Sequence, residues 1–272
     1  MCRVLNISDS SYYQWRKRPL SVRAQENEQL AADIQQLYTD NRHLYGSRRM
    51  TAALHRQGWK CNRKRVARLM RWQQLRGCER RKRRIVTTRA AADRPVAANL
   101  LQQDFSASAP NQTWLADITY IPTQEGFLYL ASLEDVFSRK IVGWAMDEQM
   151  ETVLVEDALH MALTNRPRIT HLVHHSDRGS QYTSLAYRAL LQQQGITASM
   201  SAMGNCYDNA MKESFWATLK SECVFQPFPT RAQARTAIFE YIEGFYNRQR
   251  LHSSLGYLSP DEFEHLYYSS TP

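Results

Sequence analysis

The chain has 272 residues, of which 43% are hydrophobic and 11% aromatic, so it can bury the core of more than one domain. Residues 1–95 hold 23 Lys and Arg against 7 Asp and Glu, whereas the remainder holds 12 against 19, which together give the net charge of +9. The absence of a long apolar run excludes a membrane-spanning chain, and five cysteines without paired spacing exclude a disulfide framework. We therefore expect a cytoplasmic, reduced protein whose basic half binds a polyanion, with a basic ribosomal or membrane-surface protein as the alternative.

The N-terminal segment predicts two short helices. Residues 2–15 fit the end of one helix, a turn at Asn6 and a second helix capped by Ser8. This order resembles the latter part of a helix-turn-helix, so residues 1–20 are interpreted as a partial helix-turn-helix, with Pro19 ending its second helix.

Residues 25–76 predict a basic helical DNA-binding domain. Apolar residues recur at helical spacing over 25–40, Ser47 is expected to cap a second helix that Gly58 stops, and Asn62 is expected to cap a third. The third helix has an apolar seam, around which basic residues are expected to be exposed. The residues proposed to contact DNA are Arg48, Arg49, Arg63, Lys64, Arg65, Arg68 and Arg71. The alternative is a basic helix that only faces solvent; residues 77–110, with the run 80–84, are interpreted as a basic linker.

Strands replace helices after residue 110, which predicts a second, α/β domain over 111–225. Three antiparallel strands are expected first, at 113–121, 127–135 and 139–146. They precede a helix at 151–164, a strand at 170–175, a helix at 180–194 and a strand at 196–200. Residues 226–272 are interpreted as a helical extension with one helix at Thr230 to Tyr246 and a shorter one capped by Ser259.

Three carboxylates stand at positions that suggest chemistry. Asp117 interrupts an apolar strand, Asp177 directly follows another, and Glu213 lies in a helix with 35 residues between it and Asp177. On that helix Glu213 and Lys220 lie within about 20° of each other, opposite an apolar stripe of Met211, Phe215 and Leu219. Carboxylate oxygens are preferred Mg²⁺ ligands, although each residue alone is more often a turn, edge or solvated residue. Nearby Asp208 is expected to cap the helix.

This spacing resembles the DDE signature of retroviral integrases and related bacterial insertion-sequence transposases. The match extends from near residue 1 to about 265 and is similar to the second reading-frame product (OrfB) of copy-out, paste-in elements. The segments that carry the resemblance are Trp114 to Tyr120, Asp135 to Trp144, His175 to Tyr182 and Tyr246 to Ser253. The resemblance implies an α/β, RNase H-like catalytic core in which Asp117, Asp177 and Glu213 hold Mg²⁺, or Mn²⁺ as a substitute, and Lys220 contacts DNA.

The resemblance also implies a function and partners. The activity would be cleavage at the ends of a mobile element and attack of the freed 3′-hydroxyl on a target phosphodiester. The expected partners are the double-stranded DNA of terminal repeats and target, further copies of the chain on that DNA, and an upstream reading-frame product, joined as a frameshift fusion. Met1 falls inside the helix-turn-helix and no sustained heptads follow, so end-specific binding is expected to need that fusion. The expected location is the bacterial nucleoid.

Two other functions are weighed against this hypothesis, and a zinc site is considered separately. A DNA-binding regulator without activity is disfavoured because all three carboxylates are present. A hydrolytic nuclease with the same fold, without strand transfer, stays open at this point. No zinc is expected, because the candidate ligands lack the close cysteine pair of the integrase zinc module; they are His43, His55, Cys61 and Cys78.

Overall fold

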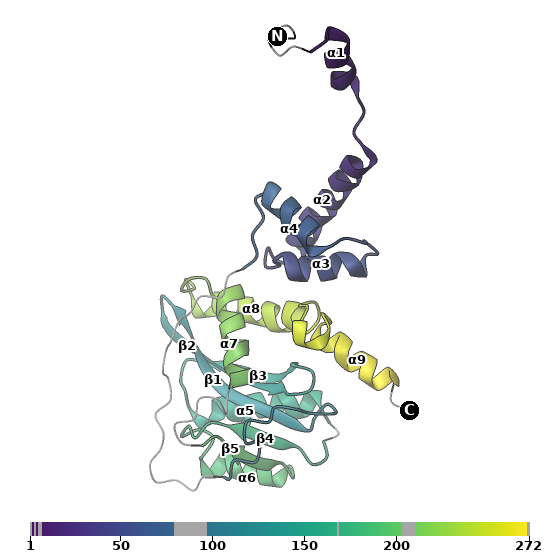
Figure 1. Cartoon of the computed structure of the whole chain (residues 1–272). Coiled ribbons are helices and arrows are strands. Elements are labelled where there is room, and N and C mark those ends of the chain that lie inside the picture. Colours follow the sequence, from purple (N-terminus) through teal and green to yellow (C-terminus); the bar gives the residue numbers. More distant parts are fainter. Residues whose placement is uncertain are drawn as a thin grey trace. The chain divides into compact units, whose positions relative to one another are not determined.

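The computed structural model describes residues 2, 4, 7–78, 97–167, 169–202 and 210–270 (Figure 1). The chain divides into two compact units, Met1–Cys78 and Glu79–Pro272. None of the helices in the described part of the chain combines the length and the apolar character that crossing a bilayer requires.

In the first unit, the described residues form the helices α1 (Asp9–Lys17), α2 (Val22–Asp40), α3 (Ser47–Arg56) and α4 (Arg63–Trp72). The Ser8 hydroxyl caps α1 by accepting from the Ser11 backbone N–H, as predicted. Helix α1 buries none of its residues, whereas α2, α3 and α4 pack on one another. The turn residue Asn6 lies outside the described residues.

The core of the first unit is formed by the apolar seams of three helices. Helix α4 contributes the seam that the sequence predicted, and Asn62 caps it by accepting from the Arg65 backbone N–H. The prediction that Ser47 caps α3 is wrong, because Gly46 occupies the cap and Ser47 is the first helical residue. The buried residues are Leu30, Ala31, Ile34, Leu37, Met50, Ala53, Leu54, Val66, Leu69 and Met70.

In the described part of the second unit, five strands form a mixed sheet. Its strands are β1 (Thr113–Thr123), β2 (Gly126–Asp135), β3 (Ile141–Asp147), β4 (Val173–Ser176) and β5 (Thr197–Met200). Their order is β3-β2-β1-β4-β5; β1 to β3 form the predicted antiparallel meander, and β4 and β5 run parallel to β1. This strand order, with the helices between the strands, confirms the expected RNase H-like fold.

The two faces of the sheet carry different helices. Side chains alternate along a strand, so Trp114 and Ala116 of β1 pack in the larger core with α5 (Thr152–Asn165) and α6 (Leu185–Gln193). Leu115 instead packs with Met211 of α7 (Ala210–Glu222). Asp117 shares the face of Leu115, and therefore points toward α7. Figure 1 shows α7 crossing that face of the strands.

Two segments depart from the expected boundaries. The helix expected from residue 180 begins only at Leu185, because the Ser184 hydroxyl caps it by accepting from the Tyr187 backbone N–H. Within the expected linker, Leu101, Phe105 and Ala107 pack against the Leu115 cluster, so residues 97–110 contribute to the core. The basic run 80–84 lies outside the described residues.

The C-terminal segment changes its helical type midway. Helix α8 (Arg231–Phe239) continues into a π-helix, η2 (Glu240–Tyr246), rather than one α-helix over the whole predicted range. The wider turn buries Tyr241 and Ile242 together with Phe245 and Tyr246. A 3₁₀ turn, η3 (Ser253–Leu255), and α9 (Pro260–Ser270) follow. Ser259 caps α9, as predicted, and forms a capping box with Glu262.

Gly143 permits the close packing of β3 on α5. A Cβ at this position would lie 2.6 Å from the Ala162 Cβ and would also clash with the Ala158 carbonyl. Gly143→Val should therefore lower the free energy of unfolding by about 1–3 kcal/mol, measured by urea denaturation. Gly244→Ala is the control, because a Cβ at that position would meet nothing within 4 Å, and it should leave stability unchanged or slightly raised. Equal stability of the two variants would contradict this packing.

Candidate active site

Parallel pairing of β1 with β4 aligns two of the three predicted carboxylates. The register pairs Thr113 with Val173 and Leu115 with His175. Asp117 lies two residues beyond Leu115, and Asp177 lies two residues beyond His175. The same offset places the two aspartates at one level, where β4 ends and β1 continues. Both residues are half-buried.

Burial and like charge both act on the pKa of the aspartate pair. Burial, followed by the negative charge of Asp177, raises the pKa of Asp117 to about 7. Two hydrogen bonds act in the opposite direction: the Trp216 indole N–H donates to Oδ2 at 2.9 Å, and the Ile118 backbone N–H donates to Oδ1 at 2.8 Å. A cation bound between the two carboxylates would relieve this repulsion.

Asp177 is held by the turn that follows it. The Gly179 backbone N–H donates to Asp177 Oδ1 at 2.9 Å, and a Cβ on Gly179 would lie only 2.9 Å from the same oxygen. Two neighbours of Asp177 make contacts toward β5. Arg178 donates through Nε to the Ser201 carbonyl at 2.8 Å, and the His175 ring bonds the Ser199 hydroxyl at 2.9 Å.

Helix α7 places the remaining predicted residues beside this pair. Its Met211, Phe215 and Leu219 are buried, which confirms the predicted apolar stripe. Glu213 is exposed and lies one turn before Trp216, and Lys220 lies one turn after it, with its ammonium 4.6 Å from the centroid of the Tyr120 ring. Burial lowers the pKa of Lys220, and the negative charge of Asp117 only partly opposes this shift.

The described residues bring Asp117 and Asp177 together, but they contain no group of three His, Cys, Asp or Glu side chains that could hold one metal ion. Glu213 therefore stands on the neighbouring helix without completing the cluster. The segment before α7, residues 203–209, which includes the predicted cap Asp208, lies outside the described residues.

A buried ion pair between α7 and β2 was not predicted from the sequence. Lys212 is fully buried, and its Nζ lies 3.9 Å from Glu134 Oε2. The same Nζ lies 4.8 Å from the ring centroid of Phe215 and 4.9 Å from that of Trp216. Burial lowers the pKa of Lys212 to about 8 and raises that of Glu134 to about 7. A charge within an apolar strand was the signal for Asp117, and the same signal could have identified Glu134.

The basic side chains of the first unit are not equivalent. Arg63, Lys64, Arg68 and Arg71 are exposed, as expected for the third helix, and Arg48 is exposed as well. Arg65 was expected to be exposed, and this is wrong: its guanidinium donates to Asn27 Oδ1 at 2.8 Å and to Glu26 Oε2 at 3.1 Å. It faces α2 because it borders the seam of α4. Arg49 is half-buried, with its guanidinium 5.9 Å from the centroid of the Tyr45 ring.

Comparison with known proteins gives the class of both units. A family model described as Integrase core domain matches residues 107–206, a second with the same description matches 194–260, and one described as HTH-like domain matches 24–84. The second unit therefore carries an integrase-type catalytic core.

Curated relatives narrow the class to a family. Over 98% of both chains, the protein is 46% identical to the "Insertion element IS600 uncharacterized 31 kDa protein" of Shigella sonnei. It is 45% identical to "Transposase InsF for insertion sequence IS3A" of Escherichia coli, over 97% of this chain and 92% of the relative. The chain belongs to the IS3 family of insertion-sequence transposases, so it is a polynucleotidyl transferase that acts in DNA transposition.

A solved structure shares the fold. The chain is similar to one in the cryoEM structure of a simian T-cell lymphotropic virus intasome in complex with PP2A regulatory subunit B56 gamma. The TM-score is 0.50 at 14% identity, over 85% of this chain and 73% of the other.

Asp117 should destabilise the metal-free protein at neutral pH. Its pKa is raised from 3.8 to about 7 on folding, so the stability that its neutral form contributes is complete below about pH 4 and is lost as pH rises through 7. Asp117→Asn, without metal, should therefore be more stable than the parent at pH 8 by about 2–4 kcal/mol and nearly equal to it at pH 4. Urea unfolding at the two pH values measures this, and a pH-independent difference would contradict it.

Proposed function

We propose that this transposase cuts DNA at the ends of its element and joins the freed 3′-hydroxyl to a target phosphodiester. Asp117, Asp177 and Glu213 would hold Mg²⁺, or Mn²⁺ in its place. The observation that carries this proposal is the Asp117–Asp177 pair, in which burial and like charge raise the pKa of Asp117 to about 7. Two adjacent carboxylates of this kind are stabilised by a cation.

The donor set suits a hard divalent ion. Mg²⁺ takes oxygen ligands and uses few protein carboxylates, and the two aspartates supply such oxygens at the end of β4. Glu213 is exposed one turn from Trp216, which itself contacts Asp117, so its side chain is available as a third ligand. A bound pair of ions would supply activation of the attacking hydroxyl and stabilisation of the leaving oxygen.

The chain's own groups orient the ligands and the substrate. Trp216 holds Asp117 Oδ2 and the Gly179 N–H holds Asp177 Oδ1, so both carboxylates have restricted orientations. Lys220 lies on the same helix, against Tyr120, which is three residues beyond Asp117. We propose that its ammonium contacts a phosphate of the DNA strand next to the reacting bond.

The first unit would provide most of the DNA affinity. Its exposed cations and its match to an HTH-like domain support phosphate contacts, which dominate duplex affinity at low salt. We further propose that several copies act together on the DNA of element ends and target, within the nucleoid. The upstream reading-frame product, as a frameshift fusion, would add end recognition.

Removing one ligand should separate cutting from binding. Asp177→Asn should abolish end cleavage and strand transfer on labelled element-end duplexes while leaving the dissociation constant for duplex DNA within a few-fold. The neutral amide weakens cation binding, and the DNA-binding cations lie elsewhere. Asp157→Asn is the control, because Asp157 is an exposed carboxylate on α5, and it should keep full activity.

Two outcomes would overturn the proposal. Near-parental cleavage by Asp177→Asn in Mg²⁺ would remove this residue from the metal site. Products that carry only hydrolysed ends, with no joined target strand in the parental protein, would identify a nuclease instead of a strand-transfer enzyme.

Arg65 and Arg68 offer a matched pair in the first unit. Arg68→Ala should lower the slope of duplex affinity against salt by about one and change the free energy of unfolding by less than about 0.5 kcal/mol, because Arg68 is exposed. Arg65→Ala should keep the slope and lose about 1 kcal/mol of stability, because Arg65 bonds Asn27 and Glu26. Filter binding across a salt series and urea unfolding measure the two effects. An exchange of the two phenotypes would refute the assignment.

A further inference from the structure

The C-terminal end of α7 is held by a buried, bidentate ion pair. Arg250 donates to both oxygens of Glu222, from Nε and from a terminal nitrogen, each at 2.7 Å. The Tyr241 hydroxyl donates to the same carboxylate at 2.8 Å. The side chains of Arg250 and Glu222 are only 4% and 5% exposed, so the pair is removed from water.

A buried ion pair is a weak source of stability, because desolvating two charges costs about as much as their attraction returns. What a bidentate guanidinium–carboxylate pair adds is direction, since two parallel hydrogen bonds fix both distance and angle. The turns after η2 fix the position of the Arg250 backbone, because its N–H bonds the Phe245 carbonyl at 2.8 Å.

The element fixed in this way carries the active-site side chains. Trp216, which donates to Asp117, lies six residues before Glu222, or about 9 Å along a rigid helix. The ring of Phe215 also meets the ring of Tyr246 from η2, with 4.9 Å between centroids. Helix α7 thus contacts the sheet through Trp216 and the C-terminal segment through Phe215 and Glu222.

We propose that Arg250 is a positioning residue for the active site. Its pair with Glu222 fixes α7 along and about its axis, which sets the Trp216 indole against Asp117 and keeps Glu213 beside the aspartate pair. The part that concerns Glu213 rests on the proposed function. The part that concerns Trp216 rests only on the contacts described above.

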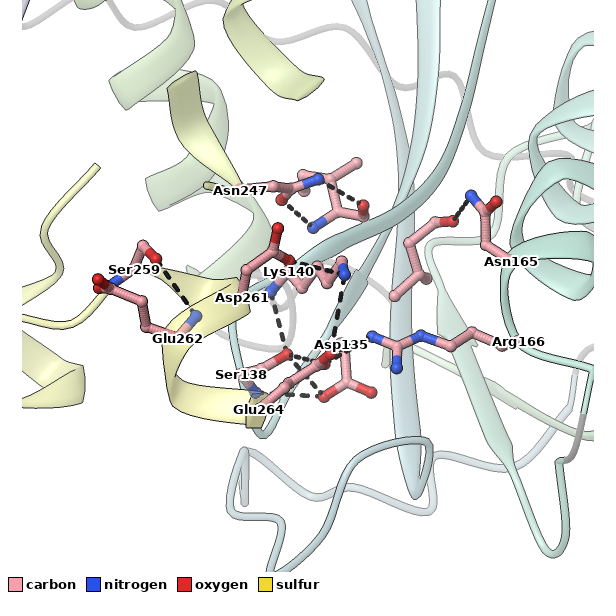
Figure 2. A network of polar contacts seen from close by, with 12 residues as sticks. Asp135, Ser138, Lys140, Asn165, Arg166, Asn247, Ser259, Asp261, Glu262 and Glu264 are labelled. Atoms are coloured by element: carbon pink, nitrogen blue, oxygen red, sulfur yellow. Dashed lines mark hydrogen bonds and ion pairs between the residues drawn. The ribbon is translucent and has the colours of Figure 1, made fainter. Parts of the chain in front are cut away.

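A second ion pair of the same chemistry serves as the control. One terminal nitrogen of Arg166 lies 2.6 Å from each oxygen of Glu264 on α9, the side chains are 11% and 6% exposed, and the Ser138 hydroxyl donates to the same carboxylate at 2.7 Å. Figure 2 shows these residues where α9 meets the turn between β2 and β3. This pair holds α9, so its loss should not move α7.

The test compares Arg250→Lys with Arg166→Lys in the full chain. One measurement is the indole N–H resonance of Trp216 in metal-free protein, assigned by Trp216→Phe. The other is the dissociation constant of Mn²⁺ from titration calorimetry. Arg250→Lys should move the resonance and raise the dissociation constant about tenfold, since a lysine cannot make the bidentate contact. Arg166→Lys should leave both unchanged while losing unfolding free energy to a similar extent.

The outcomes distinguish this inference from the proposed function. An unmoved Trp216 resonance in Arg250→Lys, or an equal movement in Arg166→Lys, overturns the positioning role. Absence of Mn²⁺ binding by the parental protein removes the metal site, yet the resonance still tests the contact of α7. If Arg250→Lys does not fold, Glu222→Gln provides the same comparison, because the amide keeps only one accepting oxygen.

Discussion

The site depends on repulsion between two carboxylates that the sheet holds side by side. The β1–β4 register places Asp117 and Asp177 at one level, and burial, followed by the negative charge of Asp177, raises the pKa of Asp117. The fold tolerates this cost because a large apolar core lies on the opposite face, and because Trp216 and two backbone N–H groups bond the carboxylates. The proposed cation would offset this cost in stability.

The other segments that carry the family resemblance hold this arrangement in place. Asp135 accepts from the backbone N–H groups of Asn111 and Phe137, at 2.7 and 2.9 Å, and so fixes the start of β1 and the turn after β2. The Asn247 amide bonds both the N–H and the carbonyl of Ile141 at 3.0 Å, in place of a neighbouring strand. The Arg250 side chain bonds Glu222, the last residue of α7. These motifs therefore tie β1, β3 and α7 to neighbouring parts of the second unit.

The sequence predicted well what depends on local periodicity. Alternation and turn residues located the strands, and the parallel offset that aligns Asp117 with Asp177 follows from the strand order of the fold that the resemblance implied. Contacts between distant segments could not be predicted from the sequence. Arg65 bonds Asn27, and Lys212 and Arg250 form ion pairs with Glu134 and Glu222. In each case a long charged side chain finds a partner on another element. No spacing rule encodes that partner.

The central claim is that a divalent cation binds between Asp117 and Asp177. A crystal structure of the protein grown with Mn²⁺, with anomalous differences collected at the manganese edge, tests it most directly. The account predicts an anomalous peak that contacts a carboxylate oxygen of each aspartate, with the Glu213 side chain turned toward it. An anomalous map without a peak at the end of β4, or with a peak bound only by other carboxylates, would contradict the account.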